Sequence, residues 1–65
     1  MALRAGQIGI TDEGDEVLFV HCDTYWVHGF IYDPIAETLV ARKWHPENGL
    51  NADENRHNIV KIKEG

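Results

Sequence analysis

Short apolar stretches separated by turn-forming residues run along the whole chain. Residues 16–22 and 25–32 are rich in Val, Phe, Trp, Tyr and Ile, which suit the pleated surface of a strand. Residues 59–63 alternate apolar and charged positions, as a half-buried strand does. No long window carries the apolar stripe of an amphipathic helix. The pattern therefore predicts an all-β chain.

Turn sequences divide the chain into five predicted strands, which cover residues 7–10, 16–22, 25–32, 38–44 and 59–63. Residues 12–15 (DEGD) and 33–36 (DPIA) form turns, because Asp favours the first position, Gly accepts positive φ and Pro presets φ. Asp23 and Thr24 form a short connector. Residues 45–58 are polar and form a long loop, with room for one helical turn at 52–56.

This spacing of strands and turns is typical of a small sandwich or barrel. A meander followed by a last strand after a long loop predicts a bent, closed barrel, because closure removes exposed sheet edges. Gly29, in the middle of a strand, indicates a bulge or a close backbone approach. The predicted core consists of Ile8, Ile10, Leu18, Val20, Val27, Ile31, Leu39, Ala41, Val60 and Ile62.

The order of elements, together with Trp44, Gly49 and the run His57-Asn58-Ile59-Val60, resembles the small SH3-like barrel proteins of tailed phages and prophages. In that family a hairpin meander leads to a tryptophan-led polar segment with a glycine, then to a closing strand. The resemblance implies a five-stranded SH3-like barrel with a long polar loop before the last strand, and a phage or prophage setting. It implies no catalytic activity.

The length of 65 residues allows a single domain, spanning residues 1–65. A core of this size supplies only about 3–5 kcal/mol of net stability. The single cysteine, Cys22, forms no internal disulfide and is expected to be a buried small apolar residue in a reducing compartment. Stability then comes from a well-formed sheet, a partner or a homo-oligomer. No secretory signal or membrane-length apolar run is found, so a cytoplasmic location is expected.

Neither catalysis nor metal binding is expected from the sequence. No motif of a nucleophile, phosphate loop or zinc protease occurs, and so small a domain has little interior for a pocket that shifts pKa values. Carboxylate pairs such as Asp12/Asp15 or Glu47/Asp53 are therefore not expected to act as acid and base. Histidine pairs His21/His28 and His45/His57 are geometrically feasible ligands, but their spacing matches no zinc pattern. No cofactor and no metal are predicted.

The formal net charge is −5, whereas DNA-binding domains are usually basic. The acids concentrate in residues 12–16 and 47–54, either as solvated loops or as a surface that docks on a basic partner or imitates phosphates. The chain has more aromatic side chains than so small a core needs, and exposed aromatic side chains are suited to a binding interface. The preferred function is a non-catalytic accessory or inhibitor that binds a protein of a host or virion. The predicted binding residues are Tyr32, Trp44, Arg42, Tyr25, Trp26, Glu47, Asp53 and Glu54.

The alternative function is a nucleic-acid-binding SH3-like module. In that case Trp44 and Tyr32 stack on bases, while Arg42, Lys43 and Lys61 contact phosphates. It requires a basic strip, which forms only if the strands of residues 38–44 and 59–63 are neighbours.

Overall fold

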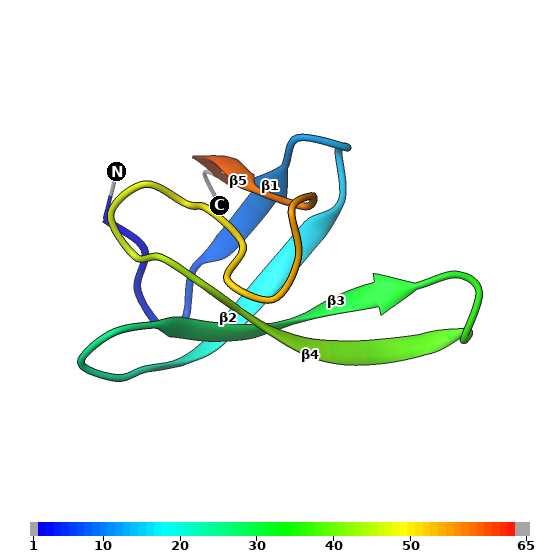
Figure 1. Cartoon of the computed structure of the whole chain (residues 1–65), viewed down its shortest axis with the longest axis horizontal. Coiled ribbons are helices and arrows are strands. Elements are labelled where there is room, and N and C mark those ends of the chain that lie inside the picture. Colours follow the sequence, from blue (N-terminus) through cyan, green and yellow to red (C-terminus); the bar gives the residue numbers. More distant parts are fainter. Residues whose placement is uncertain (1, 64–65) are drawn as a thin grey trace.

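The computed structural model describes residues 2–63 and contains one five-stranded antiparallel sheet. The strands are β1 (Ile8–Thr11), β2 (Glu16–Cys22), β3 (Val27–Asp33), β4 (Thr38–Trp44) and β5 (Ile59–Ile62). Their order across the sheet is β4-β3-β2-β1-β5, so a four-strand meander is followed by a strand that returns to pair with β1 (Figure 1). Residues 2–63 contain no helix. The predicted all-β class is confirmed.

Side-chain oxygens of turn aspartates determine where the strands end. Asp33 Oδ1 accepts hydrogen bonds from the backbone N–H groups of Ile35 and Ala36, at 2.9 and 3.3 Å. Asp23 Oδ1 accepts from the two residues before β3 in the same way, at 2.9 and 2.8 Å. These bonds occupy the backbone donors that a ladder would need, so β3 begins at Val27 and not at residue 25.

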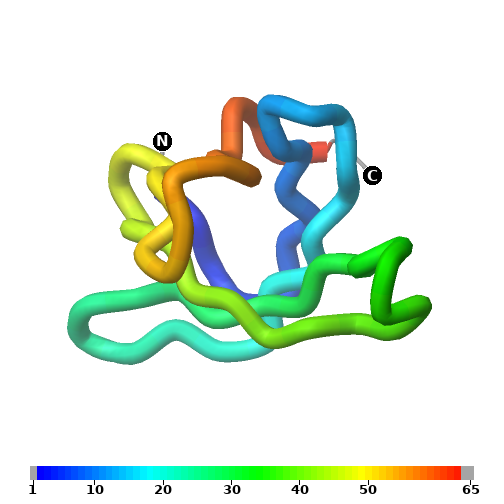
Figure 2. The backbone as a smooth tube through the Cα atoms, turned by 45° about the vertical axis from the view of Figure 1, so that its right-hand side comes forward, coloured from blue at the N-terminus to red at the C-terminus, as the bar shows by residue number. Residues whose placement is uncertain are grey.

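The sheet is strongly bent, and β1 with β5 lies above β3 with β4 in both views (Figures 1 and 2). It is not closed into a barrel, because β4 and β5 are its two edges and no ladder joins them. The segment 45–58 lies between these edges and forms hydrogen bonds with their backbone N–H and C=O groups. Ala52 N–H donates to Lys43 O at 2.8 Å, and Ile59 N–H donates to Gly49 O at 2.7 Å. The predicted closure is therefore wrong, since a loop occupies the gap.

Asn51 organises that segment and explains why no helical turn forms at residues 52–56. The side chain is buried, and its Oδ1 accepts from the N–H groups of Asp53 and Glu54 at 2.8 and 3.2 Å. A side chain that satisfies local N–H groups offers the backbone an alternative to helix. Residues 52–56 consequently form bends.

The core lies on the concave side of the bent sheet. Its rings are Phe19 and Trp44, which pack edge to face with centroids 5.6 Å apart. Trp44 is fully buried and donates from Nε1 to the carbonyl of His57 at 2.8 Å. The buried apolar residues are Leu3, Val17, Phe19, Val27, Ile31, Trp44 and Ile59.

The predicted core was correct for β3 and wrong for β2. Val27 and Ile31 are buried, and Ile62 packs against the core. In β2, however, Val17 and Phe19 face inward, because β2 is apolar on both faces and alternation alone does not choose between them. Ile8 and Ile10 are half-buried. The predicted core residues that are in fact exposed are Leu18, Val20, Leu39, Ala41 and Val60.

Gly29 confirms both expectations for a glycine in the middle of a strand. The register between β2 and β3 shifts between Phe19 and His21, which marks a bulge beside Gly29. A Cβ added at Gly29 would lie 2.6 Å from the carbonyl oxygen of Leu18. Only glycine allows the two backbones to approach this closely.

Cys22 is exposed, which corrects the expectation that it is buried. It is the last residue of β2, where the strand leaves the core and its final three residues are no longer covered. A free thiol at this position contributes nothing to the apolar core.

Candidate functional site

The predicted binding aromatics separate into exposed and buried residues. Tyr25 and Tyr32 are 73% and 54% exposed, as expected for surface contacts. Trp26 is half-buried and packs edge to face on His45, with ring centroids 4.6 Å apart. Trp44 has no exposed surface, so the expectation that it reaches the surface is wrong. It pairs with Val27, and both residues therefore face the core.

The convex side of the sheet carries large apolar side chains that neighbour one another across strands. Leu18 on β2 pairs with Phe30 on β3, and Tyr32 on β3 pairs with Leu39 on β4. Their exposed fractions lie between 40% and 61%. We call this surface the outer face and define it by Leu18, Val20, Phe30, Tyr32 and Leu39.

Two hollows flank Phe30 on the outer face. One has a volume of about 280 Å³ and lies between Val20, Phe30, Ala41 and Lys43. The other has a volume of about 220 Å³ and lies between Leu18, Phe30 and Leu39. Both hollows are shallow and open to solvent, and the volume of each is sufficient for an apolar side chain of a partner.

Ion pairs neutralise the two cations of β4, of which Lys43 lies on the same face as Phe30 and Arg42 on the face of Trp44. Lys43 Nζ lies 2.8 Å from Asp53 Oδ1, and Arg42 Nε lies 2.9 Å from Glu54 Oε1. The side-chain hydrogen bond from Lys43 is the largest cause of the lowered pKa of Asp53. Of the predicted acidic binding residues, Asp53 and Glu54 therefore serve first to tie the segment 45–58 to β4, whereas Glu47 is exposed.

One end of the outer face is acidic. Asp33 and Glu37 lie in and beside the turn that joins β3 and β4, next to Tyr32 and Leu39. Among the described residues, neither carboxylate forms an ion pair, and Asp33 Oδ1 caps the turn. The outer face is thus an apolar surface with one negatively charged border.

The structure does not assemble the predicted nucleic-acid site. β4 and β5 are opposite edges of the sheet, so Lys61 does not extend a strip from Arg42 and Lys43. Both of those cations are paired with carboxylates, and Trp44 is unavailable for stacking. Of the proposed contacts with nucleic acid, Tyr32 remains exposed on the outer face.

Two of the histidines, His21 and His28, lie beside each other, whereas His57 lies among carboxylates. His21 and His28 are paired across β2 and β3, as expected, with ring centroids 5.6 Å apart. His28 Nε2 also lies 2.7 Å from Asp23 Oδ2, and this hydrogen bond is the largest cause that lowers the pKa of Asp23 from 3.8 to about 2.

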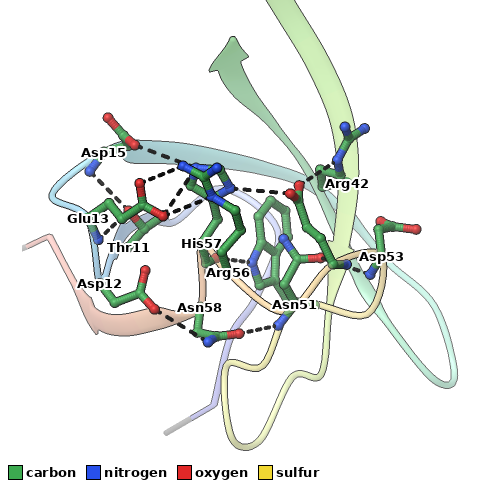
Figure 3. Close-up of polar contacts among 12 residues, drawn as sticks. Thr11, Asp12, Glu13, Asp15, Arg42, Asn51, Asp53, Arg56, His57 and Asn58 are labelled. Atoms are coloured by element: carbon green, nitrogen blue, oxygen red, sulfur yellow. Dashed lines mark hydrogen bonds and ion pairs between the residues drawn. The ribbon is translucent and has the colours of Figure 1, made fainter.

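The sequence left a His45/His57 pair geometrically possible, but the ion pairs of His57 join it to other residues. His57 lies among the carboxylates of Glu13, Asp15 and Glu54 (Figure 3). Arg56 makes two hydrogen bonds to the Glu13 carboxylate, at 2.7 and 3.0 Å, which lowers the pKa of Glu13. Sequence analysis missed this cluster because its members come from two turns far apart in the chain.

Sequence analysis also missed most of the outer face. Leu18, Val20 and Leu39 were assigned to the core, since an exposed and a buried apolar position look alike in a single sequence. The available indication was that both faces of residues 16–20 and 26–32 are apolar, although one sheet has a single core side.

Comparison with family models, with curated proteins and with solved structures finds no match to this chain. Within the described residues, no helix has the length and apolar character needed to cross a membrane.

Proposed function

We propose that this chain is a non-catalytic protein-binding module that acts as an accessory or inhibitor of a partner protein. The observation that carries this proposal is the outer face, where Leu18, Val20, Phe30, Tyr32 and Leu39 are exposed on three adjacent strands. Scattered exposed apolar residues are normal, but a contiguous group usually marks an interaction site. Phe30 and Tyr32 supply the rigid aromatic area that interface hot spots use.

The partner presents apolar side chains bordered by positive charge. Apolar side chains suit the two hollows beside Phe30, and a basic group suits the border at Asp33 and Glu37. Two copies of this chain, each with a formal charge of −5, repel one another when they approach closely. Charge therefore favours a different, basic partner over a second copy.

The strand order supports an SH3-like architecture in an open form. A meander that leads through Trp44 and a polar segment with Gly49 to a strand beside β1 has the order of elements of the phage proteins that the sequence resembles. We extend the proposal accordingly to a phage or prophage origin, with a host or virion protein as the partner and the cytoplasm as its location. The neutralised cations on β4 make nucleic acid the weaker alternative.

A pair of matched lysine substitutions tests the outer face. Leu39 and Val60 are 61% and 57% exposed, but Val60 lies on β5 and lines neither hollow. Affinity capture from a lysate, followed by mass spectrometry, should recover a partner with wild-type protein and with Val60→Lys. Leu39→Lys should abolish its recovery, because a charge at a desolvated contact is costly.

Two outcomes would contradict the proposal. If Leu39→Lys and Val60→Lys retain the same partner, the outer face is not its binding surface. If light scattering shows that the purified protein is a dimer that Leu39→Lys dissociates, the outer face binds a second copy. Circular dichroism of each variant establishes that the fold is retained.

A further inference from the structure

His57 lies between carboxylates that come from two separate segments (Figure 3). Its Nε2 is 3.7 Å from Glu13 Oε2 and 4.0 Å from Asp15 Oδ2, both in the turn after β1. Its Nδ1 is 3.6 Å from Glu54 Oε2 on the opposite side of the ring. The imidazole side chain is 18% exposed.

These distances are too long for hydrogen bonds, which measure about 2.7–3.2 Å. His57 Nδ1 is buried and has no hydrogen-bond partner among the described residues. In the neutral tautomer that directs Nδ1–H toward Glu54, Nε2 carries a lone pair and not a proton. This lone pair faces the carboxylate oxygens of Glu13 and Asp15, which repel it because they too are hydrogen-bond acceptors. Either a proton on Nε2 or a metal ion between Nε2 and the two carboxylates would resolve this unfavourable arrangement of the neutral ring.

The donor atoms lie close enough to share one ion. One donor atom from each of Glu13, Asp15 and His57 lies within 4.8 Å of the other two. Bonds of about 2.0–2.2 Å to a tetrahedral zinc ion separate its ligands by about 3.4 Å, so the donor atoms need to approach one another by up to about 1.4 Å. Asp15 is exposed and contacts only His57 among the described ion pairs, so it can make this movement, whereas Glu13 has to move together with the exposed Arg56 that holds its carboxylate.

The backbone of the two acidic residues is already fixed. Thr11 is buried, and its Oγ1 accepts hydrogen bonds from Glu13 N–H and Asp15 N–H, at 3.2 and 3.0 Å. On the other side, the carbonyl of His57 is held by Trp44 Nε1 at 2.8 Å. A rigid frame of this kind lowers the conformational entropy that is lost when the site binds a ligand.

We propose that Glu13, Asp15 and His57 Nε2 bind a zinc ion. One imidazole nitrogen with two carboxylate oxygens is a donor set of zinc, whereas magnesium and calcium prefer oxygen alone. Glu54 Oε2, 3.6 Å from Nδ1, would accept a hydrogen bond from Nδ1–H once the bound ion shifts the ring toward it, as a carboxylate beside a ligating histidine commonly does, and Arg56 orients Glu13. The ion ties the β1–β2 turn to the segment that precedes β5, in a domain with no disulfide.

Calorimetric titration of the purified chain with Zn²⁺ tests the site. Wild-type protein should bind one ion, and Asp15→Asn and His57→Asn should bind it at least tenfold more weakly. Asparagine is chosen at position 57 because His57 has a φ of 60°, a conformation that asparagine tolerates. The Asp15 side chain contacts only His57 among the described ion pairs, so Asp15→Asn keeps the test valid if His57→Asn does not fold.

His21→Gln is the matched control, since His21 and His28 form another pair that could attract zinc. It should leave the affinity unchanged. The proposal is overturned if wild-type protein shows no saturable binding, if Asp15→Asn binds as tightly as wild type, or if His21→Gln removes binding. Displacement of zinc by a small excess of Mg²⁺ would also overturn it, because the carboxylates would then act as a general acidic surface.

Discussion

Replacing Trp44 with phenylalanine removes one donor from the centre of the core. Trp44 is the largest fully buried side chain, and its indole N–H is 2.8 Å from the carbonyl oxygen of His57. Phenylalanine keeps the contact with Phe19 but leaves that carbonyl without this donor. An unsatisfied buried polar group costs about 1–3 kcal/mol. Taking about 2 kcal/mol, the midpoint of thermal unfolding should fall by roughly 8–16 °C for a domain of this size.

The more severe variant, Trp44→Ala, should not fold at 25 °C. Truncating a buried tryptophan to alanine costs about 3–5 kcal/mol. The whole domain is expected to have only about 3–5 kcal/mol of net stability. The two quantities are similar, so little folded protein should remain. A far-UV circular dichroism spectrum of a disordered chain is the expected result.

Trp26→Phe is the control, because Trp26 is half-buried and its indole forms no hydrogen bond among the described residues. It should change the free energy of unfolding by less than about 1 kcal/mol. Urea denaturation followed by circular dichroism compares all variants. The account of the core would be refuted if Trp44→Phe were as stable as wild type, or if Trp26→Phe lost as much stability as Trp44→Phe.

Three further predictions concern other parts of the sheet. Gly29→Ala should destabilise the protein by about 1–3 kcal/mol in urea denaturation, because its Cβ would lie 2.6 Å from Leu18 O; an unchanged midpoint would argue against the close approach. Since hydrogen bonding to His28 lowers the pKa of Asp23 from 3.8 to about 2, its carboxylate stabilises the fold above pH 3.8, and this contribution is lost as the pH falls through about 2. Asp23→Asn should lack that part of the pH dependence, and carboxyl NMR titration of wild-type protein should give the value directly. Cys22 is exposed, so a thiol reagent should modify the folded protein rapidly and Cys22→Ser should keep the thermal midpoint; slow modification would indicate a buried thiol.

The number and type of elements follow from local sequence. Turn residues act within a few positions, as Asp33 does when its Oδ1 caps Ile35 N–H, and Gly14 supplies a φ of 86° in the turn after β1. These preferences separated the apolar stretches correctly, and β2 and β4 have the predicted bounds. Strand identity could therefore be predicted without knowledge of what each strand packs against.

The choice of the buried face could not be predicted where both faces are apolar. In β2, Val17 and Leu18 are equally suitable for a core, and only the pairing with β1 and β3 places Val17 inside. Trp44 was expected at the surface, yet its position opposite Val27 directs it inward. The outer face exists because the neighbouring strands fix this register, and a shift by one residue would exchange the two faces.

Tertiary structure alone decided the closure of the sheet and the surroundings of His57. The segment 45–58 occupies the gap between β4 and β5 through hydrogen bonds to distant backbone groups, such as Ala52 N–H to Lys43 O. Glu13 meets His57 because β5 returns to pair with β1, which brings two turns together. Local residue preferences determined where this chain extends and turns. Which distant side chains meet was decided only when the strands paired, because that contact depends on the register of the whole sheet.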